Sequence, residues 1–166
     1  MKKIVFVISL LLLFTGCCKT SDSNDVSLKL KEIGITDLTV VDNYKIPEFK
    51  IDIKGKITSI INEEVVKNLD VFEIKAIVDD GFNKSSKTYN GIKLNDALKE
   101  ITEDTNYIAY ITDNEKLTIG YLPDELNENM FIVFDKDNKV TVTKFDRKTY
   151  NWVRNANVID LSVSFK

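Results

Sequence analysis

The chain has 166 residues, with 23 Lys and Arg against 26 Asp and Glu, no histidine, and 43% hydrophobic residues. This length suits one domain behind an N-terminal signal, and the hydrophobic share is ample for a core. The acidic balance argues against a nucleic-acid partner, which would need a basic face. The lack of histidine removes the commonest general base and metal ligand.

Residues 1–16, MKKIVFVISLLLLFTG, have the form of a secretory signal peptide. Lys2 and Lys3 open the chain, and an apolar run from Ile4 to Phe14 follows with only Ser9 inside it. The run is too short to span a bilayer as a helix. Removal of this segment leaves a net charge of −5, which argues against a basic patch that grips anionic lipid.

The segment Leu13-Phe14-Thr15-Gly16-Cys17 resembles the lipobox of bacterial lipoproteins. The resemblance implies cleavage before Cys17, a diacylglycerol on its thiol, and a protein anchored to the extracytoplasmic face of the cell membrane. Two or three acyl chains suffice, since each buried CH₂ contributes roughly 0.8 kcal/mol. Phe14 departs from the leucine usual at its position. The alternative is an ordinary secretory signal with an incidental cysteine.

Cys17 and Cys18 are the only cysteines of the chain. A disulfide between adjacent residues is strained and closes no useful loop, so Cys18 is interpreted as a bystander or a weaker acylation site. Because the chain has no histidine and both cysteines lie at the anchor, the sequence excludes a Cys-His or Ser-His-Asp site and a zinc site built on His or Cys. No cofactor is expected. Any chemistry would have to use Asp, Glu, Lys, Tyr or Ser.

The lipobox resemblance and the composition together divide the chain into an expected signal peptide (1–16), a lipidated cysteine with a flexible tether (17–27) and a single domain (28–166). Alternating apolar and polar residues predict strands within 27–33, 37–47 and 48–60. Asn62 is predicted to cap a short helix over 62–69, with Glu63 and Glu64 in its first turn, where the helix dipole favours negative charge.

The middle of the chain predicts two strands and a helix. Alternation through Phe72, Ile74, Ala76 and Val78 indicates a strand within 70–81 that meets a turn at Asp80-Gly81. A short strand is expected over 87–94. Asn95 is then expected to cap a helix with one apolar face, formed by Ala97, Leu98 and Ile101.

The last third predicts two hairpins and a final strand. Residues 106–113 and 116–122 flank the turn Asp113-Asn114-Glu115, and Pro123 is expected to begin a turn of helix. Residues 130–145 form a second hairpin with its turn at Asp137-Asn138, and a last strand is expected near 157–165. The fold class is therefore α+β: a strand-rich single domain with two or three short helices.

The segment YNGIKLNDALKEI, residues 89–101, resembles a motif of the molybdopterin-binding domain of the sulfite-oxidase family of oxidoreductases. The matching pattern is an aromatic residue, Gly, an aliphatic residue, Leu and a Leu-rich helix, here Tyr89, Gly91, Ile92, Leu94, Ala97 and Leu98. Gly91 would permit a turn, and Leu94 would act as a hydrophobic staple before the helix cap. The resemblance extends over roughly residues 50–160 and implies that family's fold.

The departures from the family argue against its activity. Catalytic members carry a molybdenum-ligating cysteine near the end of the strand that matches 71–80, and none stands around Ile77 and Val78. The chain has no histidine, and its only arginines are Arg147 and Arg154. A pyranopterin phosphate without arginine clamps or a thiolate ligand would be held poorly.

Two polar clusters are interpreted as turns rather than cation sites. Asp79-Asp80-Gly81 and the stretch Asp135-Lys136-Asp137-Asn138 are rich in oxygen ligands, and the second lacks the Gly and closing Glu of an EF-hand loop. Asp, Asn and Gly are ordinary turn residues between strands. Likewise, Glu63-Glu64 fits a helix first turn better than an acid–base pair.

The residues favoured for a ligand or partner surface are aromatic, with one cation beside them: Tyr107, Tyr110, Tyr121, Trp152 and Arg154. Tyr150 belongs to the same aromatic set, and most such residues in a strand-rich domain serve as core. The leading hypothesis is a membrane-anchored, non-catalytic binding or accessory module for a small molecule or a protein. The alternatives are a residual oxidoreductase or carboxylate-based hydrolase, and a structural envelope protein that docks to another protein.

Overall fold

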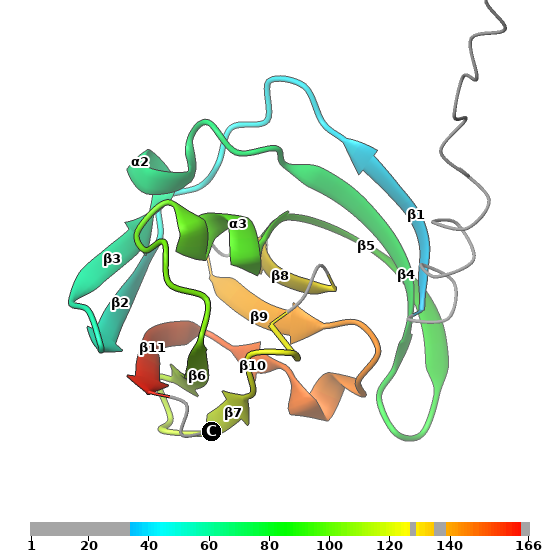
Figure 1. The fold of residues 1–166 in the computed structure, drawn as a ribbon. Coiled ribbons are helices and arrows are strands. Elements are labelled where there is room, and N and C mark those ends of the chain that lie inside the picture. Colours follow the sequence, from blue (N-terminus) through cyan, green and yellow to red (C-terminus); the bar gives the residue numbers. More distant parts are fainter. Residues whose placement is uncertain (1–33, 127–128, 135–138, 164–166) are drawn as a thin grey trace, which may run out of the picture.

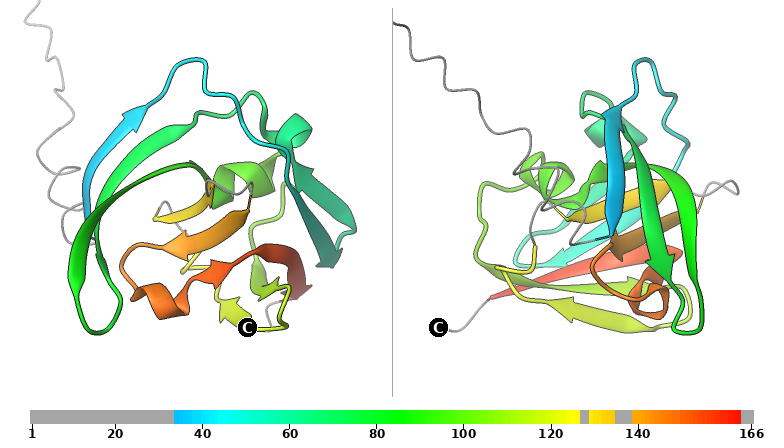
Figure 2. Two further views of the ribbon diagram at one scale, coloured as in Figure 1. Left: turned by 180° about the vertical axis from the view of Figure 1, so that it is seen from behind. Right: turned by 90° about the vertical axis from the view of Figure 1, so that its right-hand side faces the viewer.

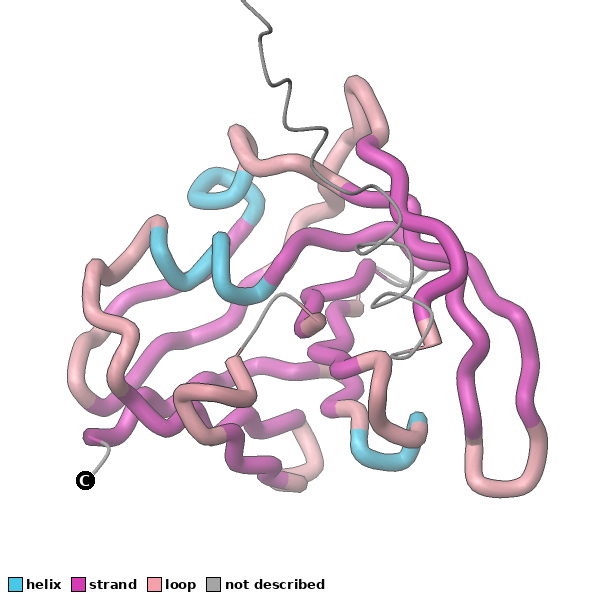
Figure 3. Tube along the Cα trace, turned by 45° about the vertical axis from the view of Figure 1, so that its right-hand side comes forward, coloured by secondary structure: helices cyan, strands magenta, loops and turns pink. Residues whose placement is uncertain are grey.

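A computed structural model describes residues 34–126, 129–134 and 139–163. The predicted strand at 27–33, the signal peptide, the lipobox and the turn at Asp137-Asn138 lie outside these residues. Strands make up most of the described chain, and the helices are short (Figure 3). No helix in this part of the chain is long and apolar enough to cross a membrane.

The strands form two sheets (Figure 1). The first has six strands in the order β1-β4-β5-β8-β9-β10: Ile35–Val40, Phe72–Asp79, Lys84–Lys93, Met130–Phe134, Val140–Lys144 and Val153–Arg154. The second has five in the order β3-β2-β11-β6-β7: Ser59–Asn62, Lys50–Gly55, Ala156–Val163, Tyr107–Asp113 and Thr118–Tyr121. The β2–β11 pair is parallel, and the other described pairs are antiparallel.

The larger hydrophobic core joins the two sheets. It includes Ile51 and Ile53 of β2, where the predicted alternation is confirmed, and Ile132 of β8 from the other sheet. Helix α3, Leu94–Lys99, adds Leu94, Ala97 and Leu98, all buried. Since one cluster takes residues from both sheets, the two sheets and α3 belong to a single domain.

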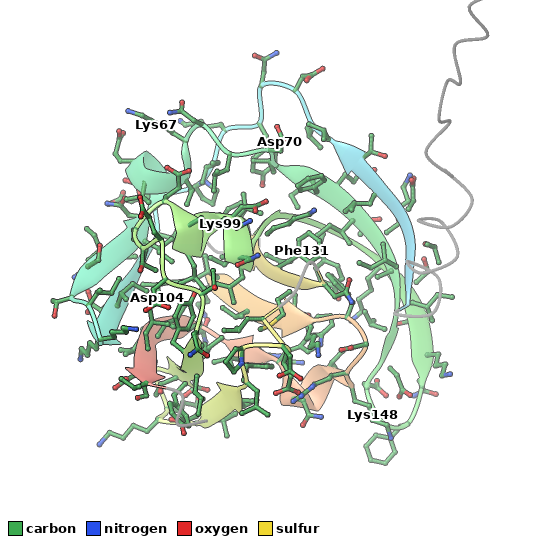
Figure 4. The ribbon with its side chains drawn as sticks, in the orientation of Figure 1. Lys67, Asp70, Lys99, Asp104, Phe131 and Lys148 are labelled. Carbon is green, nitrogen blue, oxygen red and sulfur yellow. The ribbon has the colours of Figure 1, made fainter. Side chains whose placement is uncertain are left out.

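A second core lies inside the curved six-stranded sheet. Strands β1, β4 and β5 arch over β8 and β9 (Figures 1 and 2), and Ile74, Ala76 and Val78 of β4 face inward as predicted. Phe131 lies inside this arch (Figure 4). Strand β8 has every residue buried, because its side chains alternate between the two cores. Its unbroken apolar sequence, MFIVF, is typical of a strand covered on both faces.

The helices confirm one predicted cap and correct another. Helix α2, Glu63–Val66, is capped by Asn62, whose side-chain oxygen accepts a hydrogen bond from the Val65 amide at 3.0 Å. The predicted cap at Asn95 is wrong. Helix α3 begins at Leu94, its cap position is Lys93, and no side chain caps it. Leu94, expected before the cap, is the first helical residue because its burial fixes the entry of the chain.

Two further expectations change. Gly91 lies within β5, opposite Phe72 and Val133, and makes no turn. Pro123 begins turns rather than a helix over residues 123–126: the Leu122 carbonyl accepts hydrogen bonds from the Glu125 and Leu126 amides. The only other described helical element is the 3₁₀ turn η1, Thr149–Asn151.

Candidate functional site

The five residues favoured from sequence do not form one surface. Tyr107 and Tyr121 are buried in the larger core, where burial raises the pKa of both phenols. The guanidinium of Arg147 lies 5.2 Å from the Tyr121 ring centroid and covers it. Tyr110 is 39% exposed on β6, paired with Gly120 of β7. Tyr107 and Tyr121 are therefore structural, and Tyr110 lies at the surface of the second sheet.

Trp152 and Arg154 line one depression of about 460 Å³ at an end of the molecule. In Figure 1 the orange turn that follows β9 lies at the bottom, between the β4–β5 hairpin and strands β6 and β7. Three separate segments supply the remaining lining: Asp80; Asp113, Asn114, Glu115 and Leu117; Thr149 and Asn155. Residues far apart in the sequence thus meet at one concave surface, which is where ligands usually bind.

The β6–β7 turn is held by the carboxylate of Asp113. Its Oδ1 accepts hydrogen bonds from the amides of Glu115 and Leu117, both at 2.8 Å, and the side chain is 9% exposed. Lys116 adopts φ 68°, a left-handed conformation that the turn requires. The turn therefore presents Asn114, Glu115 and Leu117 in a fixed arrangement.

Asp80 reaches the depression from the tip of the β4–β5 hairpin. Its Oδ1 accepts hydrogen bonds from the amides of Phe82 at 2.9 Å and Asn83 at 2.7 Å. These bonds from Asn83 and Phe82 hold the pKa of the Asp80 carboxyl below its usual range. Asp80 is therefore an anion at neutral pH and, since it is exposed, can still interact with a ligand cation.

Trp152 forms the apolar floor. Its ring packs edge-on against Phe145 at 5.3 Å and Tyr89 at 5.6 Å between centroids, and the side chain is 6% exposed. Its indole N–H is buried and has no hydrogen-bond acceptor among the described residues. A buried donor without an acceptor costs about 1–3 kcal/mol.

The charges around the depression are of both signs. Arg154 is exposed and makes no ion pair within the described part of the chain. Asp80, Asp113 and Glu115 carry the opposite charge. A ligand with an acceptor or anionic group could face Arg154, and a cationic group could face Asp80 and Glu115. The arrangement can bind a small polar molecule without covalent chemistry.

The pyranopterin that the family resemblance implies does not fit these residues. Val78, in the region where a thiolate would be expected, is 4% exposed and packs in the second hydrophobic core. Arg147 is ion-paired with Glu125, so only Arg154 offers a guanidinium to an anion. One exposed arginine and an apolar strand end provide neither the clamp nor the metal ligand that the cofactor needs.

The polar clusters weighed from sequence serve local structure. Asp79 Oδ1 accepts a hydrogen bond from the Gly81 amide at 2.7 Å, as in an ordinary aspartate turn. Glu63 accepts one from the Phe49 amide, and Glu64 pairs with Lys67, so both serve the start of α2. Among the described residues no group of acidic side chains is arranged to hold a metal ion. Residues 135–138 lie outside them.

The sequence predicts the turns at Asp80 and at Asp113-Asn114-Glu115, but it does not predict that they line one depression. Asp80 and the Asp113-Asn114-Glu115 turn were each predicted as loops, with no role at a site. The signal that could have found the site is weak. It consists of three segments that each carry a charged residue, and two of these segments connect the strands of the β4–β5 and β6–β7 hairpins. The first sheet is curved (Figure 2), and Asp80 from its β4–β5 hairpin lines the same depression as Asp113 and Arg154.

Comparisons of the chain with models of protein families, with curated proteins and with solved structures find no match.

Proposed function

We propose that this protein is a lipoprotein, anchored through Cys17 to the extracytoplasmic face of a cell membrane, whose domain acts as a non-catalytic binding or accessory module. The observation that carries the anchor is the segment Leu13-Phe14-Thr15-Gly16-Cys17 behind a basic start and an apolar run. Two or three acyl chains would hold such a chain without a spanning helix.

The binding role is supported by the depression around Trp152 and Arg154. It combines the ring of Trp152, the guanidinium of Arg154, which has no ion pair among the described residues, and the carboxylates of Asp80 and Glu115. We propose a small polar ligand that places a carboxylate or carbonyl oxygen between Trp152 and Arg154. The exposed guanidinium of Arg154 would form a charge-assisted hydrogen bond with such an oxygen.

We also propose that the domain is a reduced relative of the molybdopterin-binding oxidoreductase domain. Support comes from residues 89–101, where β5 runs directly into α3 and the motif residues Ile92, Leu94 and Leu98 are buried. In this proposal the fold has been kept for binding, and the cofactor chemistry has been lost along with its ligands.

The anchor is tested by metabolic labelling with an alkyne-bearing fatty acid in a bacterial host. Wild-type protein and Cys18→Ala should carry the label and remain in the membrane fraction. Cys17→Ala should lose the label. Equal labelling of Cys17→Ala and wild type would disprove the assignment of Cys17, and an unlabelled wild-type protein with a free thiol there would disprove the anchor itself.

The binding role is tested by native mass spectrometry, with elemental analysis, on protein gently extracted from its membrane. A small-molecule mass should accompany the wild type and be lost from Arg154→Ala. Lys67→Ala, a cation on α2 far from the depression (Figure 4), is the control and should keep the mass. A pterin-sized mass with molybdenum or tungsten would overturn the non-catalytic role.

A further inference from the structure

The tip of the β4–β5 hairpin presents an exposed phenylalanine. Phe82 is 95% exposed, the most exposed of the large hydrophobic side chains in the described chain. Transfer of a large apolar side chain from water to an apolar phase is favourable. The tip therefore has a cost in solution that contact with an apolar surface would remove.

The hairpin tip is held so that Phe82 stays outward. The amides of Gly81, Phe82 and Asn83 donate to the carboxylates of Asp79 and Asp80, and the Asp80 amide donates to the Asn83 carbonyl at 3.1 Å. Gly81 adopts φ 93°, which a side chain would disfavour. Because these backbone donors are already bonded, the tip can approach an apolar phase without leaving them unpaired.

The chain enters the domain at the same end. Gly34 accepts a hydrogen bond from the Ile77 amide at 2.8 Å, and Ile35 pairs with Ala76. Strand β1 then runs away from the tip, to Val40 opposite Phe72 (Figure 1). Gly34 thus lies opposite Ile77, five residues before Phe82, which is at most roughly 18 Å of extended chain.

The reach of the preceding segment fits contact with the membrane. Residues 18–33 separate Cys17 from Gly34. The seventeen Cα–Cα steps from Cys17 to Gly34 can span at most roughly 60 Å, and the composition predicts a flexible tether over 18–27. A lipid on Cys17 would therefore keep the β4–β5 tip within reach of the bilayer, so that contact becomes an intramolecular event.

The charge of the β4–β5 tip favours insertion at the bilayer interface over attraction to charged head groups. Asp79 and Asp80 precede Phe82, and Lys84 and Lys87 follow it, so the tip has no net charge. A neutral tip with one protruding aromatic ring is suited to the boundary between head groups and acyl chains. Leu117, which is 50% exposed, lines the same depression as Asp80 and adds apolar surface at this end.

We propose that Phe82 inserts into the interface of the membrane that carries the Cys17 anchor, and that this contact orients the domain with its β4–β5 tip toward the bilayer. The proposal rests on the lipid anchor proposed above. It does not depend on the ligand of the depression.

The test uses the lipidated full-length protein in vesicles of phosphatidylethanolamine and phosphatidylglycerol, with and without brominated phosphatidylcholine. Phe82→Trp places a reporter at the tip, and Val40→Trp, 47% exposed at the far end of β1, is the matched control. The native Trp152 is buried, and the wild-type signal is subtracted as background. F82W should lose emission to the brominated lipid and shift to shorter wavelength, whereas V40W should do neither.

The outcomes separate the two proposals. If the protein floats with the vesicles and F82W is not quenched, the insertion of Phe82 is disproved and the anchor stands. Equal quenching of both variants would disprove the orientation. A wild-type protein that does not float with the vesicles would disprove the anchor, and the insertion with it. A wavelength shift without quenching would assign the tip to a protein pocket and overturn the proposal.

Discussion

At Gly91 the missing side chain is what allows β5 to lie closely against β8. A Cβ atom at this position would lie 2.5 Å from the Ile132 carbonyl oxygen and 3.0 Å from Val133 Cα. Both atoms are backbone and cannot move without shifting β8, which is buried on both faces. The glycine that the family motif suggested as a turn residue is therefore needed for packing.

Gly91→Ala is expected to destabilise the fold by about 1–3 kcal/mol, since overpacking forces the backbone to shift. Gly120→Ala is the control: its Cβ would meet only the Tyr110 ring, at 3.0 Å, on a side chain that is partly exposed and free to move. Urea unfolding followed by circular dichroism gives both free energies of unfolding. Equal values for the two variants would contradict this account of Gly91.

Asp37 offers a test of electrostatics at a single residue. Lys75 Nζ donates to its carboxylate at 2.9 Å, and this bond, together with the charge of Lys75, holds the pKa of Asp37 below its usual value of about 3.9. A lowered pKa in the folded state means that the stabilisation is present above the unfolded value. It is lost as the pH falls through the folded value.

Carbon-detected NMR should therefore place the titration midpoint of Asp37 below that of an unstructured aspartate. Lys75→Met should move the midpoint up toward the ordinary value. Lys67→Met should leave it unchanged, since Lys67 pairs with Glu64 on α2. An unshifted midpoint in the wild type would mean that the Asp37–Lys75 pair is not formed in solution.

At the scale of elements, the two helix starts look alike in sequence and differ in structure. Asn62 and Asn95 each precede an acidic residue and an apolar stretch. Asn62 is extended and its side chain bonds the Val65 amide, whereas Asn95 is already inside α3. Leu94 accounts for the difference, because its burial in the core draws the helix start one residue ahead of the polar side chain.

Asn62→Ala is expected to destabilise the domain by about 1 kcal/mol through the loss of this cap. Asn95→Ala should be neutral or slightly stabilising, because alanine is the better helix former and no cap is lost. Thermal unfolding of the two variants against wild type measures the difference. A larger loss of stability for N95A than for N62A would mean that Asn95 caps α3 after all, as the sequence predicts.

Most strands could be predicted because alternation marks a half-buried strand, as in β4 with Ile74, Ala76 and Val78. The extent of β5 could not. Its first residues, Lys84 to Lys87, are polar and exposed, and pairing with β4 rather than burial makes them a strand. The depression could not be predicted from the sequence either, because Asp80, Glu115 and Arg154 come from separate segments that only the folded sheet brings together.

At the scale of the whole molecule, β8 couples the two hydrophobic cores. Ile132 points into the larger core between the sheets, and Val133, its neighbour, points into the core under the arch of β1, β4 and β5. Trp152 reports on the second core, whereas circular dichroism reports on all strands. A shared central strand makes it difficult for either core to unfold alone.

The domain should therefore unfold in one step, with coincident transitions in Trp152 fluorescence and far-UV circular dichroism. Ile132→Ala is expected to cost about 2–5 kcal/mol, and Val133→Ala less because fewer atoms are removed. Each variant should lower both transitions together, although each cavity lies in only one core. If V133A shifted the fluorescence transition and left the dichroism transition in place, the arch of β1, β4 and β5 would be a separately folding unit. If the fluorescence and dichroism transitions coincide in both variants, the arch of β1, β4 and β5 keeps its shape only while the larger core is folded. The β4–β5 tip would then keep its position under the same condition.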